Sequence, residues 1–382
     1  MEFTAKSADL KKALSVVSLA TGDKEDTLPS HALFRLNSGG DLKMFATDGD
    51  RFAVAGCETI SAEVSETNEF TADPKKLTAL LNSSESDEIR FVYKDEETTL
   101  HVFASENKES YVAFGSFKPQ NALPFEEELD NLQEVKSVNS EALKRGIKFT
   151  QGFMSTEENN RKYSCVYISQ GVFYSSNGYN CVSAFQSPEF EGVEFIVLRG
   201  PMIPQVASAT DKFDTDEVTI KTTSKFVSFW SDTGDGFGFL KSTEELPKLP
   251  ISLEPPDWDS FTVSRSLLSK KLSRLAITSK ATGIQAVITG NAMDLTTLDE
   301  RASTETIDIT RKTGDESVTV RPGFKGFRDA LNQYWTEEID IYVKSRCYIC
   351  CNGEILLEAE EGSDREVISF SAASVIAMVR DT

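Results

Sequence analysis

FTAKSADLKKAL, residues 3–14, is the stretch on which the fold prediction rests, because similar stretches return twice along the chain. Residues 261–272 read FTVSRSLLSKKL, with the same Phe-Thr opening and a similar leucine- and lysine-rich continuation. Residues 140–147 read SEALKRGI and repeat the spacing of residues 7–14. The copies start about one third of the chain apart, far more than the ~20–50 residues of solenoid repeats. We therefore predict three copies of one domain-sized unit.

The size and composition of the chain fit this division. Its 382 residues suit three domains of about 100–200 residues, and 39 % hydrophobic residues with 25 Phe can supply several cores. Two stretches have the composition of connectors: Pro124–Leu132 is acidic, and Thr243–Ser260 contains four prolines. We therefore predict domains at residues 1–125, 135–248 and 258–382.

Each unit has the pattern of two helices and several antiparallel strands, which predicts an α+β fold. Leu10, Leu14 and Val17 form one apolar stripe of a helix. Asp73 and Pro74 are typical of an N-cap followed by proline in the first turn. The six predicted helices span Ser7–Thr21, Asp73–Leu81, Asn139–Gly152, Leu198–Ser208, Ser264–Lys280 and Arg321–Tyr334.

The net charge of −21 is not spread evenly along the chain. An acidic chain argues against nucleic acid as a partner, because phosphate binding needs Lys and Arg. Each of the six predicted helices, however, carries a net positive charge, whereas strands, turns and connectors are acidic. Two explanations stay open: the cations are ordinary solvated helix residues, or they form a surface that faces phosphate.

Several segments, in this order, resemble the bacterial-type DNA sliding clamp, the beta subunit of the replicative polymerase. They are Met1–Leu19, Ala46–Ala53 (ATDGDRFA), Phe70–Leu77 (FTADPKKL) and Val375–Arg380 (VIAMVR). The resemblance covers the whole chain and also suits a divergent or phage-encoded version. It implies three similar domains of the clamp type, each with two helices on antiparallel sheet, that form half of a ring closed by a second copy.

This resemblance implies a noncatalytic processivity factor without a cofactor, which encircles duplex DNA without reading its sequence. Helices would line the pore, and sheets would form the outer wall. The residues that it places in the DNA-facing pore are Lys11, Lys12, Lys75, Lys76, Lys144, Arg145, Lys148, Arg199, Lys270, Lys271, Arg274, Lys325 and Arg328.

The resemblance also implies a pocket for a short peptide motif of DNA polymerase, the clamp loader and other clamp-motif proteins. Carried onto this chain, the pocket comprises Ser176, Gly178, Tyr179, Asn180, Cys181, Pro247, Val375, Ile376, Ala377, Met378, Val379 and Arg380. The family usually has Thr-Asp-Gly-His-Arg-Leu where residues 176–181 read SNGYNC, and proline where Met378 stands, so the preferred motif is open. Without the resemblance, Val375–Val379 is equally consistent with a terminal strand.

Closure of a homodimeric ring would join the first domain of one copy to the third domain of another. The resemblance assigns Tyr111 and Ala113, in a late strand, to one side of this contact. It assigns Leu275, Ile277 and Thr278 to the other side, with Ile277 as the apolar anchor.

The sequence contains no pattern typical of a catalytic or metal site. His31 and His101, the two histidines, fall in alternating strand patterns, and Cys347, Cys350 and Cys351 lack the further ligands of a zinc site. No run of 18 apolar residues predicts a membrane span, and the first residues lack the pattern of a secretion signal, so we expect a cytoplasmic protein with no membrane partner. The rival hypotheses are a clamp-fold interaction scaffold that does not encircle DNA, and a nuclease that acts through carboxylates.

Overall fold

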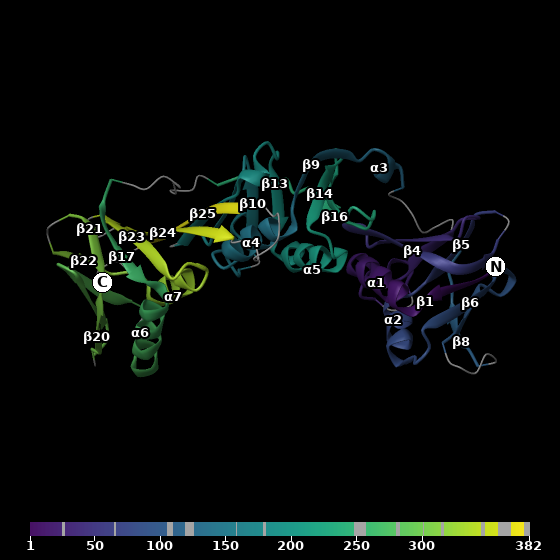
Figure 1. Cartoon of the computed structure of the whole chain (residues 1–382), viewed down its shortest axis with the longest axis horizontal. Coiled ribbons are helices and arrows are strands. Elements are labelled where there is room, and N and C mark those ends of the chain that lie inside the picture. The colour runs from purple at the N-terminus through teal and green to yellow at the C-terminus, as the bar shows by residue number, and fades with distance from the viewer. Residues whose placement is uncertain are drawn as a thin grey trace, which may run out of the picture. The chain divides into compact units, whose positions relative to one another are not determined.

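The computed structural model describes residues 1–24, 27–64, 66–104, 110–118, 126–157, 159–178, 181–247, 257–279, 283–300, 302–314, 317–344, 348–357 and 368–377. Over these residues the chain is a mixture of helices and strands, and every paired strand in the sheets is antiparallel to its neighbours. The same order of elements occurs three times (Figure 1). The α+β prediction is confirmed.

The first copy has the order strand, helix, four strands, helix, three strands. Its elements are β1 (Glu2–Lys6), α1 (Ser7–Val17), β2 (Ala32–Leu36), β3 (Asp41–Thr47), β4 (Arg51–Glu63), β5 (Asn68–Ala72), α2 (Pro74–Ser83), β6 (Glu88–Lys94), β7 (Thr99–Phe103) and β8 (Val112–Gly115).

The second copy follows the short helix α3 (Glu126–Asp130), which lies in the predicted acidic connector. Its elements repeat the order of the first copy: β9 (Gln133–Asn139), α4 (Ser140–Gln151), β10 (Cys165–Ser169), β11 (Val172–Ser176), β12 (Cys181–Gln186), β13 (Ile196–Arg199), α5 (Ile203–Phe213), β14 (Glu217–Thr222), β15 (Phe226–Trp230) and β16 (Gly236–Leu240).

The third copy has one strand more than the others. Its elements are β17 (Asp259–Ser264), α6 (Arg265–Thr278), β18 (Ile284–Thr289), β19 (Ala292–Thr297), β20 (Thr304–Asp308), β21 (Thr310–Thr313), β22 (Val318–Val320), α7 (Phe324–Leu331), β23 (Glu338–Lys344), β24 (Tyr348–Leu357) and β25 (Ile368–Ala377). The extra strand arises because β20 and β21 together take the place of the long β4: β20 pairs with β19 as β4 pairs with β3, and β21 pairs with β17 as β4 pairs with β1.

The pairing of strands is also repeated. The first strand of each copy pairs with the strand after the second helix: β1 with β6, β9 with β14, and β17 with β23. The last three strands form a meander in each copy, and the three strands after the first helix form another. Shared pairing is stronger support for an internal repeat than shared element order, because it requires the same fold in three dimensions.

Two strand pairs join one copy to the next, and they use equivalent strands. In the first junction β4 pairs with β16, with Val54 opposite Gly236. In the second junction β12 pairs with β25, with Cys181 opposite Ile376. Each junction thus joins the third strand after a first helix to the last strand of the following copy. The remaining equivalents, β20 and β8, are each the terminal strand of a sheet.

The chain groups into two compact units that divide the second copy between them. One unit comprises Met1–Ser140 and Pro204–Lys241, and the other comprises Glu141–Ile203 and Ser242–Thr382. The inter-copy ladders explain this grouping, because each joins half of the second copy to a neighbour. The domain boundaries at 1–125, 135–248 and 258–382 remain a prediction.

Local sequence signals account for the starts of α2 and α6. The Asp73 carboxylate accepts hydrogen bonds from the backbone amides of Lys75 and Lys76 at 2.9 and 3.2 Å, and Pro74 occupies the first turn of α2. The Ser264 hydroxyl caps α6 in the same way. The predicted helix Leu198–Ser208 is wrong in its bounds: α5 begins at Ile203, because Gly200, Pro201 and Pro204 disfavour helix before it.

Aromatic side chains fill the cores between helices and sheets. In the first copy Phe3 stacks on Phe91 with centroids 4.7 Å apart, and the buried stripe of α1 (Leu10 and Leu14) faces the strands. In the third copy Tyr334, which follows α7, is 1 % exposed. No helix in the described part of the chain is long and apolar enough to cross a membrane.

Candidate functional site

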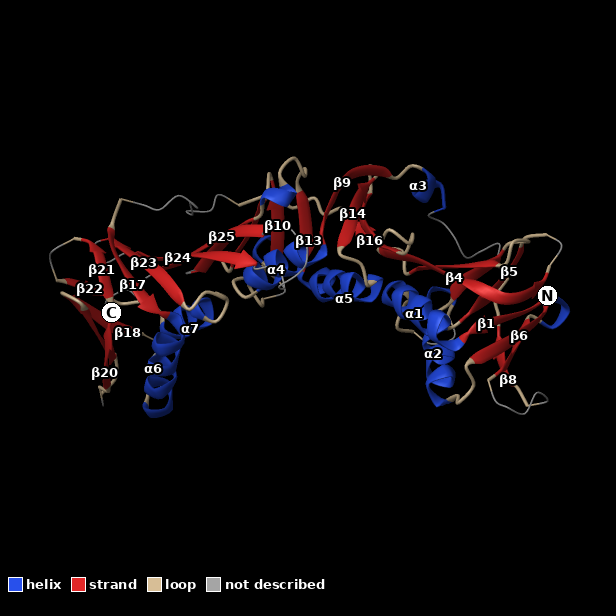
Figure 2. Cartoon of the chain, in the orientation of Figure 1, coloured by secondary structure: helices blue, strands red, loops and turns tan. Residues whose placement is uncertain are grey.

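The helices of the first and third copies lie in pairs against their strands (Figure 2). α1 packs against α2, and α6 packs against α7. Most of the predicted pore residues lie on these helices and on α4. Arg199 is an exception: it is the last residue of β13, where its guanidinium Nε donates to the hydroxyl of Ser242 at 3.4 Å. α5 itself carries one acid, Asp211, and one base, Lys212, so it is neutral.

Many of the helix cations are already paired with carboxylates of the same chain. The pairs are Lys12 with Asp214 (3.7 Å), Lys75 with Asp23 (3.2 Å), Lys144 and Arg145 with Glu141 (3.6 and 2.9 Å), Lys271 and Arg274 with Glu305 (2.6 and 3.8 Å), and Arg328 with Asp329 (3.8 Å). Exposed pairs of this kind are worth roughly 0–1 kcal/mol each. They nevertheless reduce the positive potential of the helix surface.

A smaller group of helix lysines carries its charge without such a partner. Among the described residues, Lys11, Lys148, Lys270 and Lys325 have no carboxylate within ion-pair distance. The last three are exposed. They lie on α4, α6 and α7, so the second and third copies carry the most available positive charge.

Arg145 has a second partner besides Glu141. Its guanidinium lies 5.7 Å from the ring centroid of Trp335, which packs in turn against Phe149 and Phe185 at 6.1 and 6.4 Å. This cluster joins α4 of the second copy to the segment after α7 of the third. Arg145 therefore contributes to packing between these copies, a role that the sequence did not indicate.

The loop Ser176–Cys181 and the strand β25 are the two predicted walls of a peptide pocket, and they are neighbours in one sheet. Cys181 is opposite Ile376, and Val182 is opposite Val375. The loop is closed by its own hydrogen bonds: the hydroxyl of Ser176 donates to the carbonyl of Cys181 at 2.9 Å, and the amide of Gly178 donates to that hydroxyl at 3.0 Å. Backbone pairing thus fixes the distance between the two walls.

Gly178 has a conformation and a neighbour that both require glycine. Its φ is +79°, and a Cβ at this position would lie 2.6 Å from the ring of Tyr163. Tyr163 is therefore a member of this surface that sequence reasoning missed, since only the fold brings residue 163 beside residue 178. Pro247 is buried. Tyr179, Asn180, Met378, Val379 and Arg380 lie outside the described residues, and for Val375, Ile376 and Ala377 only the backbone is described.

The residues predicted for ring closure differ in exposure. Tyr111 is 51 % exposed beside β8, where it stacks on His101 with centroids 4.1 Å apart, and Ala113 is exposed within β8. Ile277 is 83 % exposed. Leu275 is 2 % exposed, so its assignment to an interface is wrong: it belongs to the buried stripe of α6. The side chain of Thr278 is not among those described.

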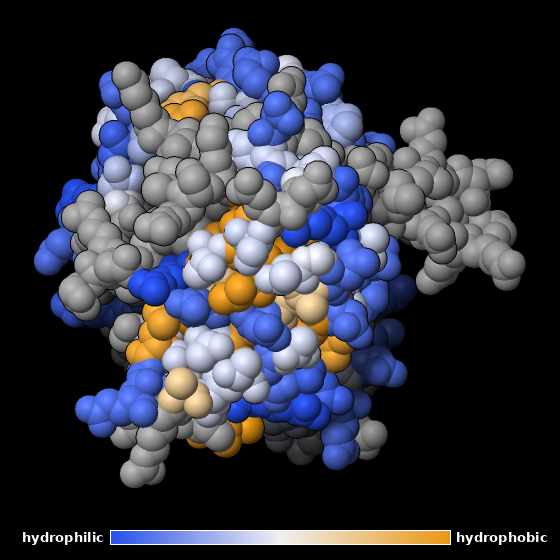
Figure 3. Space-filling view, turned by 90° about the vertical axis from the view of Figure 1, so that its left-hand side faces the viewer, coloured by the Kyte–Doolittle hydropathy of each residue, from blue (hydrophilic) through white to orange (hydrophobic). Residues whose placement is uncertain are grey.

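Apolar surface gathers on the side of the molecule where β20, β21 and β22 lie. Figure 3 shows hydrophobic side chains in a broken band over the middle of this face. Among the residues of the third copy that the structure describes, the large hydrophobic side chains that are exposed are Leu267, Ile277 and Leu298. An edge strand with apolar surface nearby is typical of a protein interface.

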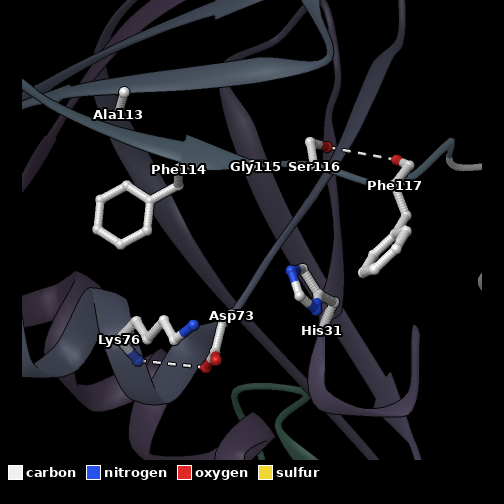
Figure 4. Close-up of a pocket in the computed structure, with 8 residues that line it drawn as sticks. All are labelled: His31, Asp73, Lys76, Ala113, Phe114, Gly115, Ser116 and Phe117. Atoms are coloured by element: carbon white, nitrogen blue, oxygen red, sulfur yellow. Dashed lines mark hydrogen bonds between the residues drawn. The ribbon is translucent and has the colours of Figure 1, made fainter. Parts of the chain in front are cut away.

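A concavity of about 390 Å³ lies beside β8 (Figure 4). It is lined by His31, Asp73, Lys76, Ala113, Phe114, Gly115, Ser116 and Phe117. Its polar groups already have internal contacts. The His31 Nδ1 lies 3.1 Å from the Thr27 carbonyl oxygen, and the hydroxyl of Ser116 lies 3.2 Å from that of Thr71. The concavity is therefore part of the surface along the β8 edge.

The three cysteines whose side chains the structure describes, Cys57, Cys165 and Cys181, are not activated thiols. Burial raises the pKa of the Cys57 thiol to about 12, and the pKa values of the Cys165 and Cys181 thiols to about 11. These thiols are protonated at neutral pH and are poor nucleophiles. No group of His, Cys, Asp or Glu among the described residues has the geometry to hold a metal ion.

No protein-family model matches the sequence. No curated protein matches it either. Solved structures, in contrast, match along the whole chain. The beta subunit of DNA polymerase III from Pseudomonas aeruginosa is 16 % identical, with a TM-score of 0.78 and 100 % of each chain covered.

Two further solved structures have the same coverage of 100 % on both sides. The beta sliding clamp of Caulobacter crescentus, solved with polyethylene glycol at its beta-motif tethering region, is 15 % identical with a TM-score of 0.79. The DNA polymerase III beta subunit of Thermotoga maritima is 15 % identical with a TM-score of 0.76. The chain therefore has the DNA sliding-clamp fold, as the sequence predicted.

Proposed function

We propose that this chain is a DNA sliding clamp: a noncatalytic, cytoplasmic processivity factor. It would close as a homodimer around duplex DNA and tether the polymerase. The observation that carries the proposal is the match of the whole chain to solved clamps, with 100 % of both chains covered. A protein that had kept only part of a clamp for another purpose would not need the full set of three copies.

Ring closure is proposed to use β8 of one copy of the chain and β20 of another. Both strands are terminal in their sheets, and they are the equivalents of the strands that pair at the two internal junctions. Antiparallel pairing of β20 with β8 would repeat those junctions a third time. Tyr111 and Val112, at 51 % and 45 % exposed, and Ile277, at 83 %, supply apolar surface near this contact.

The proposed DNA contact is electrostatic and independent of sequence. Lys148, Lys270 and Lys325 are exposed lysines on three helices, which suits contacts with phosphate rather than with base edges. The net charge of −21 then keeps DNA away from the rest of the surface. Retention on DNA would depend on the closed ring, because a few lysines give only weak binding.

The proposed tethering site is the groove between the Ser176–Cys181 loop and β25. Its support is the register that sets Cys181 opposite Ile376 and the Tyr163 ring over Gly178. Short peptides from DNA polymerase, a clamp loader and other clamp-motif proteins are the proposed occupants. In the Caulobacter clamp, polyethylene glycol is bound at the tethering region of that protein, and the corresponding region is proposed to bind partners here.

Retention on circular DNA tests the proposal. The full-length protein is loaded onto nicked circular plasmid with a clamp loader, and the bound fraction is measured by gel filtration before and after linearisation. We expect a dimeric mass in solution, stable retention on the circle and rapid loss from the linear form. An equal bound fraction on circular and linear DNA, or a protein that stays monomeric at all concentrations, would overturn the proposal.

A further inference from the structure

Glu305 connects β20 to α6 in the third copy. It lies in β20, and its carboxylate accepts a hydrogen bond from the Lys271 ammonium at 2.6 Å. The guanidinium of Arg274, one turn along α6, lies 3.8 Å from the other carboxylate oxygen. The side chains of Glu305 and Lys271 are each 21 % exposed, less than in the pairs of Lys12, Lys75 and Lys144.

The carboxylate accepts the hydrogen bond that Lys271 could otherwise donate to a phosphate oxygen. A carboxylate is a planar oxyanion and a phosphate is a tetrahedral one. Both bind ammonium and guanidinium groups by charge-assisted hydrogen bonds. The hydrogen bond from Lys271 lowers the pKa of Glu305 below its usual value, so the carboxylate stays charged at neutral pH. A phosphate that approaches Lys271 must therefore displace Glu305 or remain at a distance.

Lys270, the neighbour of Lys271 in the sequence, provides an internal comparison. It is exposed on the same helix and has no carboxylate within ion-pair distance among the described residues. The two lysines thus differ chiefly in whether an internal anion competes for them. The ion pair of Lys271 is shorter and less exposed than the pairs of Lys12 and Lys75, which are 3.7 and 3.2 Å long.

We propose that Glu305 competes with DNA phosphate for Lys271 and Arg274. By holding these two cations in internal ion pairs, Glu305 keeps the affinity of the third copy for DNA low. The inference rests on the proposed clamp function and extends it to the strength of the contact. Weak contact suits a ring that must move along DNA, since the ring itself prevents escape. Because Glu305 belongs to β20, the competition also lies next to the proposed point of closure.

A double-mutant cycle on the full-length protein tests this. Glu305→Gln, Lys271→Gln and the double variant are compared by fluorescence anisotropy with a linear duplex of about 30 base pairs over a range of salt concentrations. Glu305→Gln should bind about three- to tenfold more tightly at low salt. The slope of log binding constant against log salt concentration (the salt slope) should become steeper by about 1–2. Lys271→Gln alone should change the affinity less than about twofold, but in the Glu305→Gln background it should remove most of the gain.

Asp340→Asn is the matched control. It breaks the Lys312–Asp340 pair, which is 2.7 Å long and belongs to the same copy, and it should change neither affinity nor slope. Dimer mass and thermal stability are recorded for each variant, because Glu305→Gln also removes a link between α6 and β20. A lower melting temperature with unchanged affinity would mean that Glu305 only stabilises the fold, and would overturn the inference.

The comparison of Lys271→Gln with Lys270→Gln does not depend on whether Glu305→Gln folds. If both single variants weaken binding equally, Lys271 is already available to DNA and the inference is wrong. If Lys270→Gln weakens binding while Glu305→Gln leaves it unchanged, the competition is absent but the clamp proposal stands. If the wild type is not retained on circular DNA and Lys270→Gln has no effect, the clamp proposal itself fails.

Discussion

The carboxylate of Asp235 accepts a hydrogen bond from the backbone amide of Gly56 at 3.1 Å. This bond lies where β4 changes partner: Val54 is opposite Gly236 of β16, whereas Thr59 is opposite Ala5 of β1. Gly56 is opposite Lys43 of β3 on one side of β4, and on the other side, between these two positions, its amide donates to the Asp235 carboxylate. A single buried carboxylate thus completes the first inter-copy junction.

Asp235 should make the stability of this junction depend on pH. Burial raises its pKa above the ordinary value of 3.8, against smaller opposing effects of the Gly56 hydrogen bond and of nearby Lys12. An acid whose pKa is higher in the folded state binds its proton more tightly there, so its contribution to stability falls as the pH rises from about 3.8 through the raised pKa. Urea unfolding between about pH 4 and pH 7 should show this decline, and Asp235→Asn should flatten it.

The comparison of two variants separates charge from hydrogen bonding at this position. Asp235→Asn keeps an oxygen acceptor for Gly56, whereas Asp235→Ala removes it and should cost about 1 kcal/mol of unfolding free energy relative to Asn. Equal stability of the two variants would mean that water replaces the side-chain oxygen acceptor at no cost. An unchanged pH profile in Asp235→Asn would contradict the role assigned to its ionisation.

Gly178→Ala should weaken binding of a clamp-motif peptide without changing the oligomeric state. The substitution places a Cβ at positive φ and within 2.6 Å of the Tyr163 ring, so the loop must move by an amount that alters the proposed peptide-binding surface. A cost of about 1–2 kcal/mol in local stability is expected from the backbone alone. Isothermal titration with a peptide from the cognate polymerase measures the effect.

Gly192→Ala is the control for backbone strain in the same copy. Gly192 has φ +80°, but a Cβ there would meet nothing within 4 Å. It should lower stability by a similar amount and leave peptide affinity unchanged. If both variants bind the peptide as the wild type does, the Tyr163–Gly178 contact does not belong to the binding groove.

Substitutions of Arg145 and Lys148, which lie on the same helix, should have different effects, because the first is a structural cation and the second is proposed to contact DNA. Arg145 pairs with Glu141 and lies over Trp335, so Arg145→Gln should lower the unfolding free energy by about 1 kcal/mol and change the salt slope of DNA binding little. Lys148 is exposed, so Lys148→Gln should leave stability unchanged and reduce the slope by about 0.9. If Arg145→Gln reduced the salt slope and Lys148→Gln lowered the unfolding free energy, the structural role would belong to Lys148 and the DNA contact to Arg145.

Much of the fold could be predicted from the sequence because its signals are local. The cap at Asp73 and the stripe of α1 act within a few residues, and the repeat of residues 3–14 reports on the architecture. The start of α5 was missed because Gly200 and two prolines shift it toward Ile203, and α3 lies in a stretch with the composition of a connector. The sequence therefore missed one short helix, α3, and misplaced the start of another, α5.

The candidate site was less predictable because its contacts are distant in sequence. Nothing near Lys271 in the chain indicates Glu305, and nothing near Gly178 indicates Tyr163; only the tertiary fold brings these residues together. Leu275 is a different case, since its spacing of seven from Leu268 already places it on the buried stripe of α6. That assignment could have been corrected from the sequence.

Ile277→Asp should abolish dimer formation while leaving the chain folded. The side chain is 83 % exposed, so a charge there costs little in the single chain, whereas burial of that charge between two copies would cost several kcal/mol. Leu275→Ala is the complementary variant: at 2 % exposed it should cost about 2–5 kcal/mol of folding stability through a cavity. Sedimentation velocity gives the mass of each variant, and thermal unfolding gives its stability. A dimeric Ile277→Asp protein would remove Ile277 from the proposed closure and leave the β8–β20 edge pairing to be tested alone.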